Sequence, residues 1–161
     1  MALSEIRKLG DPILLTVAEP VKRDELEDLI PVIEKMHVLI KEFRSAYGRG
    51  RAIAAPQAGL SRRIICLNID RPQVIINPVI EYRSDEMIDV WDDCMSFPDL
   101  LVFLKRHKRI TVSFYDLDWK QQRWELTDDM SELIQHEYEQ LDGIRAISRC
   151  TDPKNMKWID S

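Results

Sequence analysis

Long apolar runs and clustered positive charge are both missing from this 161-residue sequence. No apolar stretch approaches the ~20 residues that a membrane-spanning helix needs. The first ten residues, MALSEIRKLG, lack the charged-then-apolar order of a signal peptide. The formal net charge is −5, whereas nucleic acids and anionic membranes call for clustered positive charge. We therefore expect a cytoplasmic protein that binds neither a membrane nor a nucleic acid.

Cysteine is scarce, and the number of cysteines is odd: Cys66, Cys94 and Cys150 are not spaced as in a disulfide framework. In a reducing compartment we expect free thiols or a metal ligand rather than disulfides. Internal repeats, low-complexity segments and linkers are also absent. With 45% hydrophobic residues, residues 1–161 are predicted to form a single domain around one core.

The densest basic run is KRHKR, Lys105 to Arg109. Apolar residues flank it on both sides. We interpret it as the solvated entry to a strand rather than as a patch that binds nucleic acid.

Apolar residues recur at helical spacing from Asp24 to Phe43, with charged residues between them, which predicts an amphipathic helix. Pro31 lies inside this segment, and the missing N–H of a proline is harmless only in the first turn. The helix is therefore expected to start close to Pro31. His37 is interpreted as a surface or boundary residue.

Runs rich in β-branched residues follow at 63–69, 73–82 and 109–117, and they are predicted to form strands. A last helix is predicted from Thr127 or Asp128, either of which can cap it, to Gly143, which suits a C-terminal stop. The order helix, strands, helix indicates an α+β fold.

The last helix contains the segment QHEYEQLDG, Gln135 to Gly143. His136 and Gln140 are four residues apart and share one helix face, so they can share a ligand. Glu137 is rotated about 100° from His136, which is the usual place for a general base beside a metal. Taken alone, an HExxQ pattern is weak, because such a pair more often lies on a helix surface.

Two further segments strengthen this interpretation. In GRGRAIAAPQAGL, residues 48–60, glycines and alanines precede Pro56 and Gln57, a composition that lets a backbone pass close to a ligand. The alternative is a mobile surface loop. In WDDCMSFPDL, residues 91–100, an acidic residue precedes Cys94, and the alternative is a buried free thiol in a strand.

The three segments together resemble the peptide deformylase family, whose signatures GxGxAAPQ, EGCxS and QHExDHLxG occur in that order. They correspond to residues 50–57, 92–96 and 135–143. IRKLGDPILLTVAEPV, IINP and RITVSFYDLD are also similar to that family, so the resemblance covers nearly the whole chain. It implies antiparallel β-sheets packed around a central C-terminal helix that carries the metal motif.

The resemblance also implies a metal site and a general base. Cys94 and His136 match two of the family's metal ligands, and Gln140 stands where the family has its second helix histidine. The implied metal is Fe²⁺, replaceable by Zn²⁺, Ni²⁺ or Co²⁺, with a water in the fourth position. Glu137 matches the glutamate that takes the proton of that water and returns it to the leaving amine.

Further roles carry over from the same motifs. Gln57 and the backbone N–H of Met95 correspond to the groups that stabilise the oxyanion, and Ser96 is retained. The implied substrate is a formylated N-terminal methionine, whose side chain enters an apolar pocket lined by Leu133. Substrate contacts are also expected at three positions of the first motif: Gly50, Ala52 and Ile53.

Four departures from the family pattern lie within the motifs. The amide oxygen of Gln140 is a poorer donor to iron or zinc than imidazole, so metal affinity should fall. Ala52 adds a Cβ where the substrate backbone should approach, Asp93 replaces a glycine beside Cys94, and Glu139 replaces an aspartate. Asp93 is a candidate replacement ligand, although neighbours along a strand point to opposite faces.

We therefore predict a metal-dependent amide hydrolase of the deformylase type, which acts in N-terminal processing on formylated peptide N-termini or on a related small N-acyl amine. The alternative is a non-catalytic relative that binds peptide N-termini or a partner protein. An HExxH-type protease would leave Cys94 and Gln57 unexplained.

Overall fold

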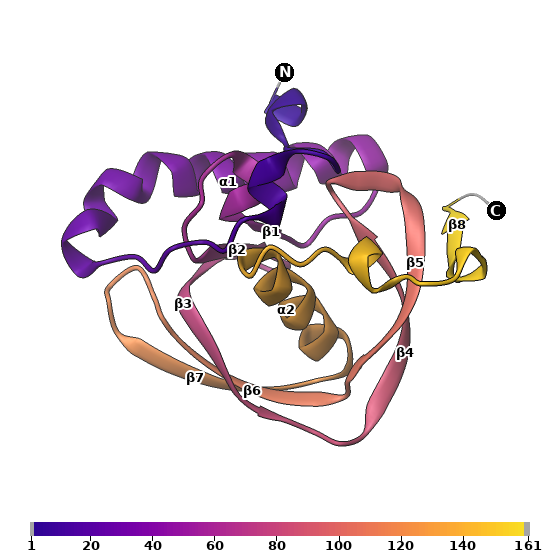
Figure 1. Cartoon of the computed structure of the whole chain (residues 1–161). Helices are drawn as coiled ribbons and strands as arrows, with labels where there is room; N and C mark the ends of the chain where they lie inside the picture. Colours follow the sequence, from indigo (N-terminus) through magenta and orange to yellow (C-terminus); the bar gives the residue numbers. More distant parts are fainter. Residues whose placement is uncertain (1, 160–161) are drawn as a thin grey trace.

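Two antiparallel sheets enclose a central helix in the computed structural model, which describes residues 2–159 (Figure 1). The five-stranded sheet has the order β1 (Ala52–Ala54), β2 (Ile64–Asn68), β3 (Pro72–Arg83), β6 (Arg109–Tyr115) and β7 (Gln121–Thr127). The three-stranded sheet has the order β4 (Met87–Cys94), β5 (Phe97–His107) and β8 (Met156–Trp158). Helix α2 (Asp128–Leu141) lies between them. The predicted α+β fold is confirmed.

The long helix α1 (Leu26–Tyr47) packs its apolar face against β2. Its buried side chains recur three or four residues apart, as an amphipathic helix requires, and they are Ile33, Met36, Leu39, Ile40 and Phe43. They join the strand side chains Ile64, Cys66 and Ile76 in one hydrophobic cluster. Across residues 2–159 no helix is long and apolar enough to cross a membrane.

The expected start of this helix was wrong. Helix α1 begins at Leu26 and contains Pro31 in its second turn. Pro31 removes the hydrogen bond to the carbonyl of Glu27, but both residues lie on the exposed face, where water can bind the freed carbonyl. Leu29 and Ile30 pack against the hydrophobic cluster and extend the helix across the proline.

Helix α2 starts and stops close to the predicted residues. Thr127 occupies the N-cap position but makes no capping bond with its side chain. At the other end Gly143 adopts φ +74, and Ile144 N–H donates to the carbonyl of Glu139 at 2.9 Å. A Cβ on Gly143 would lie 2.6 Å from the carbonyl oxygen of Leu15, so this stop needs glycine.

Two polar side chains fix the position of α2 against β5. Ser131 Oγ donates to the carbonyl of His107 at 2.8 Å. Gln135 accepts from the N–H of His107 at 3.0 Å and donates to its carbonyl at 2.8 Å. The backbone of one strand residue therefore sets the register of the helix that carries the HExxQ segment.

The glycine- and alanine-rich segment is not a mobile surface loop. It contains β1 and a short 3₁₀ helix, Ala55–Ala58, and all of these residues are buried. Residues 91–100 form the end of β4, a two-residue turn and the start of β5. Both segments thus bring their motif residues to α2. The three cysteines are free, as expected.

Candidate active site

Three donor side chains converge between β4 and α2. Cys94 is the last residue of β4, and His136 and Gln140 stand one turn apart on α2. Gln140 Nε2 lies 3.1 Å from Cys94 Sγ and 3.5 Å from His136 Nε2. All three residues are buried, and Gln140 is 0% exposed. The structure therefore brings together the three residues predicted as metal ligands.

Their spacing fits a metal ion. Tetrahedral Zn²⁺ with bonds of about 2.3 Å to sulfur and about 2.0–2.1 Å to nitrogen separates its donors by about 3.4–3.6 Å. Gln140 Oε1 is buried and has no hydrogen-bond partner among the described residues. Rotating this amide by 180° would aim the orphaned oxygen at the other donors, and amide nitrogen and oxygen are assigned from such networks. Across residues 2–159 no three His, Cys, Asp or Glu side chains are placed to hold a metal, so a three-donor site here would have to include another residue type, such as the amide of Gln140.

A buried chain of charges orients His136. Asp92 Oδ2 lies 2.9 Å from His136 Nδ1 and accepts from Arg106 Nη2 at 2.7 Å, and Arg106 Nη1 donates to Glu139 at 2.5 Å. Burial alone would raise the pKa of Asp92, but His136 and Arg106 outweigh it and hold this pKa at about 2. An ionised Asp92 fixes a proton on Nδ1 and leaves Nε2 free for a metal.

Arg106 corrects the interpretation of the basic run at 105–109. Its side chain is 3% exposed, because it lies between Asp92 and Glu139. Only the neighbouring Lys105 and Arg109 are exposed, as a solvated strand entry predicts. In a strand successive residues face opposite sides, and this alternation was the available signal that one member of the run turns inward.

Glu137 stands beside the donors, and within residues 2–159 it forms no ion pair. Its side chain is buried, and Oε1 has no hydrogen bond within the described part of the chain. Burial raises the pKa of Glu137 to about 7. A carboxyl group with a pKa near neutrality can both accept and return a proton. The position and protonation of Glu137 therefore suit a general base.

The side chain of Gln57 extends from the 3₁₀ helix after β1 to Cys94 and Ser96. Its Oε1 accepts from the backbone N–H of Ala54 at 2.9 Å, which aims Nε2 at Cys94 Sγ, 3.3 Å away, and at Ser96 Oγ, 3.2 Å away. Met95 follows Cys94 in the turn between β4 and β5, and its side chain is buried. Fixed N–H donors beside the predicted metal ligands would be placed to stabilise a developing oxyanion.

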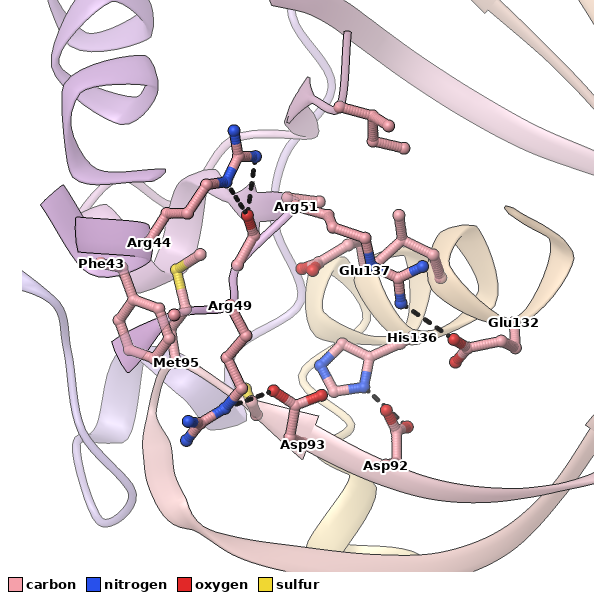
Figure 2. A pocket seen from close by; sticks show the side chains of 16 residues that line it. Phe43, Arg44, Arg49, Arg51, Asp92, Asp93, Met95, Glu132, His136 and Glu137 are labelled. Carbon is pink, nitrogen blue, oxygen red and sulfur yellow. Dashed lines mark hydrogen bonds and ion pairs between the residues drawn. The ribbon is translucent and has the colours of Figure 1, made fainter. Parts of the chain in front are cut away.

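An open pocket of ≈ 590 Å³ leads to these groups (Figure 2). Gly50, Ala52 and Leu133 line it, as expected of substrate contacts. Ile53 does not line it, because its side chain is fully buried in the cluster beneath α1. Strand alternation explains the difference, since Ala52 and Ile53 face opposite sides of β1.

Strand β1 also offers a free backbone edge, because it is the outer strand of its sheet. Asn68 N–H donates to the carbonyl of Arg51, and Ile53 pairs with Cys66 of β2. The intervening residue Ala52 therefore points its N–H and C=O away from β2. An extended peptide could add to this edge beside the pocket.

Asp93 is not brought to the metal donors. Its Oδ2 pairs with Arg49 Nε at 3.2 Å, and its side chain is 39% exposed at the pocket mouth (Figure 2). Arg49 also donates to the carbonyl of Pro98 and lies over the ring of Phe43. The buried neighbours Asp92 and Cys94 lie on the opposite face of β4, as strand alternation requires.

The chain is similar to known proteins in both sequence and structure. The family model described as "Polypeptide deformylase" matches residues 3–156. A peptide deformylase of Dictyoglomus thermophilum is 35% identical over 153 residues, which cover 93% of this chain and 94% of the relative. The crystal structure of peptide deformylase from Thermotoga maritima superposes with a TM-score of 0.83 at 32% identity, covering 91% of this chain and 97% of that one. A Met-Ala-Ser-bound class I type b peptide deformylase from Acinetobacter baumannii has a TM-score of 0.81 at 26% identity, covering 90% and 96%.

Proposed function

The chain belongs to the peptide deformylase family, and from this membership we propose that it hydrolyses N-formyl peptides with Cys94, His136 and Gln140 as the ligands of a divalent metal. The observation that carries the proposal is the convergence of these three donors, with Gln140 Nε2 at 3.1 Å from Cys94 Sγ and at 3.5 Å from His136 Nε2, beside the buried Glu137, whose Oε1 has no hydrogen bond within the described residues. Fe²⁺ is the proposed metal, and Zn²⁺, Ni²⁺ and Co²⁺ are the alternatives. We propose a cytoplasmic location, where nascent chains are processed.

The metal would supply a Lewis acid and a water of lowered pKa. Cys94 would bring one negative charge to it, and His136 and Gln140 would be neutral donors. This ligand set has the same charge as a Cys-His-His set. The change at residue 140 therefore weakens the bond to the metal more than it alters the acidity of the water.

The chain's own residues would carry the proton and the developing charge. Glu137 takes a proton from the water as the water oxygen attacks the formyl carbon. The N–H groups of Gln57 and Met95 stabilise the oxyanion. Glu137 then returns the proton to the nitrogen as the C–N bond breaks, which releases a free amine and formic acid, which ionises to formate in water.

The free edge of β1 would hold the peptide in an extended form. Ala52 presents its backbone N–H and C=O on that edge, and the pocket beside it accepts the first side chain. One similar structure, that from Acinetobacter baumannii, is described as bound to Met-Ala-Ser. A formylated peptide N-terminus is the partner we propose for this chain.

The non-catalytic alternative is not favoured. A binding protein would not need a buried carboxylate beside three converging donors, because an unpaired buried carboxylate is costly to keep. Glu137 has this arrangement together with the fixed amide of Gln57. Such a costly group is typical of catalysis.

The test is the formyl-peptide activity of protein loaded anaerobically with Fe²⁺, Ni²⁺ or Co²⁺. Glu137→Gln should lower kcat by roughly 10²–10⁴-fold, since general acid–base catalysis contributes that much. Glu27→Gln, at an exposed position on α1, is the matched control and should keep wild-type activity. Turnover by the wild type that does not exceed that of Glu137→Gln with any of the metals would refute the proposal.

A further inference from the structure

An ion pair forms part of the wall of the active-site pocket. Arg51 Nη2 lies 3.0 Å from Glu132 Oε1, and both residues line the pocket beside Leu133. Figure 2 shows Arg51 reaching from the segment before β1 towards Glu132 on α2, close to His136. The sequence led us to expect an apolar pocket at Leu133. The wall there combines an apolar surface with a salt bridge.

The buried member of the pair is the carboxylate. The side chain of Glu132 is 13% exposed and that of Arg51 is 39% exposed. Burial, followed by the nearby Asp92, raises the pKa of Glu132, and Arg51 only partly offsets them. A hydrogen-bond donor on a ligand would therefore stabilise the ionised carboxylate of Glu132 further.

Arg51 has donors to spare as well. Within the described chain its guanidinium makes one hydrogen bond, from Nη2 to Glu132, whereas an arginine carries five N–H donors. A side chain that both donates and accepts would bond to each member of the pair without breaking it. A thioether placed here would bury polar groups that it cannot satisfy.

The charges that face the pocket exclude an acidic side chain. The carboxylates of Glu132 and Asp92 and the carboxyl of Glu137 line the pocket with His136. Arg49 is paired with Asp93 at the mouth, and the guanidinium of Arg44 is bonded to the backbone carbonyls of Gly50 and Asn68. A substrate carboxylate would be repelled by the lining carboxylates. It could accept from the spare donors of Arg51 but could not donate to Glu132, whose carboxylate would face it as a like charge.

We propose that Arg51 and Glu132 determine substrate specificity, and that they select N-formyl compounds whose first side chain is a neutral hydrogen-bonding group, with the carboxamide of glutamine as the prototype. This selection rests on the proposed function, because it assigns the substrate class of the same site. The carboxamide accepts from Arg51 and donates to Glu132, and the α-formamido group lies at Glu137 and the metal ligands.

The experiment compares kcat/KM for formyl-Gln-Ala-Ser, formyl-Met-Ala-Ser and formyl-Glu-Ala-Ser on metal-loaded protein. We expect the glutamine peptide to equal or exceed the methionine peptide, and the glutamate peptide to be at least about tenfold slower, since like charges in a pocket oppose binding. The double variant Arg51→Leu/Glu132→Leu removes both charges together and leaves neither unpaired. It should reverse the preference to methionine by about tenfold or more.

A second ion pair gives the matched control. Arg123 Nε and Glu81 Oε2 lie 3.0 Å apart on exposed positions of β7 and β3, outside the pocket. The double variant Arg123→Leu/Glu81→Leu should leave the ratio of the glutamine and methionine peptides unchanged.

Binding of the product peptides separates this proposal from the proposed function. Calorimetry with Gln-Ala-Ser and Met-Ala-Ser needs no turnover, so it measures selection even if no formyl peptide is hydrolysed. A tenfold or greater preference of the wild type for methionine, in kcat/KM or in Kd, would overturn the proposal. An unchanged ratio in the Arg51→Leu/Glu132→Leu variant would overturn it as well.

Discussion

Replacing Gln140 with histidine should tighten metal binding. Residue 140 is fully buried, and its amide nitrogen lies 3.1 Å from Cys94 Sγ and 3.5 Å from His136 Nε2. An imidazole of similar volume at this position would complete a Cys-His-His set, and imidazole binds Fe²⁺, Ni²⁺ and Zn²⁺ better than an amide oxygen does.

The size of the effect follows from comparable changes. Alterations around a metal site commonly change affinity 10–100-fold, which corresponds to about 1.4–2.8 kcal/mol. We expect Gln140→His to gain at least this much. Gln140→Leu, which has a similar volume and no donor, should lose about as much, and its packing cost should stay below ~1.5 kcal/mol.

The assay is competition with a chromophoric chelator under anaerobic conditions, using Co²⁺ and Zn²⁺. Urea unfolding of each metal-free variant checks that the fold is kept. Cys94→Ala should abolish binding in the same assay. If the His and Leu variants both bind metal within about threefold of the wild type while Cys94→Ala does not bind, residue 140 is not a ligand and the reasoning fails.

Three further predictions concern the support of the site. Arg106→Met should lower the free energy of unfolding by about 3 kcal/mol or more, because it removes the buried cation that Asp92 and Glu139 share; a loss below ~1 kcal/mol in urea unfolding would contradict the buried network. Gly143→Ala should cost clearly more than Gly48→Ala, since their φ values are +74 and +73 but only the first meets a backbone oxygen, at 2.6 Å; equal shifts in Tm would contradict this contact. Iodoacetamide at pH 8 should modify Cys150 and spare Cys66 in the native protein, because Cys66 is fully buried and burial raises the pKa of its thiol; mass spectrometry would show the opposite order if Cys66 were accessible.

Periodicity and motif spacing predicted the elements and residues that depend on local sequence. The helix that ends at Gly143 follows from a pattern of neighbouring residues, and so does the shared face of His136 and Gln140. The meeting of the three motif segments was expected from the family resemblance and not from periodicity. The start of α1 was missed because packing of residues before Pro31 outweighs one lost hydrogen bond.

The remaining errors concern partners far apart in the sequence. Arg106 was taken as solvated because its role depends on Asp92 and Glu139, which β4 and α2 bring to it. Glu132 was not singled out because a glutamate on a helix usually faces solvent, and only the approach of Arg51 from another element reveals its place in the pocket. Long-range ion pairs leave no periodic signal in one sequence.

The charge chain from Asp92 through Arg106 to Glu139 contacts one of the two proposed metal ligands on α2 and not the other. It orients His136, whereas the side chain of Gln140 hydrogen-bonds only to Cys94 and His136 within the described residues. Residue 140 can therefore change identity without disturbing the scaffold that aims the imidazole. If residue 140 is a metal ligand as proposed, histidine and glutamine could replace each other there by substitution at one position, which would change one donor to the metal and leave the fold and the other proposed catalytic groups intact.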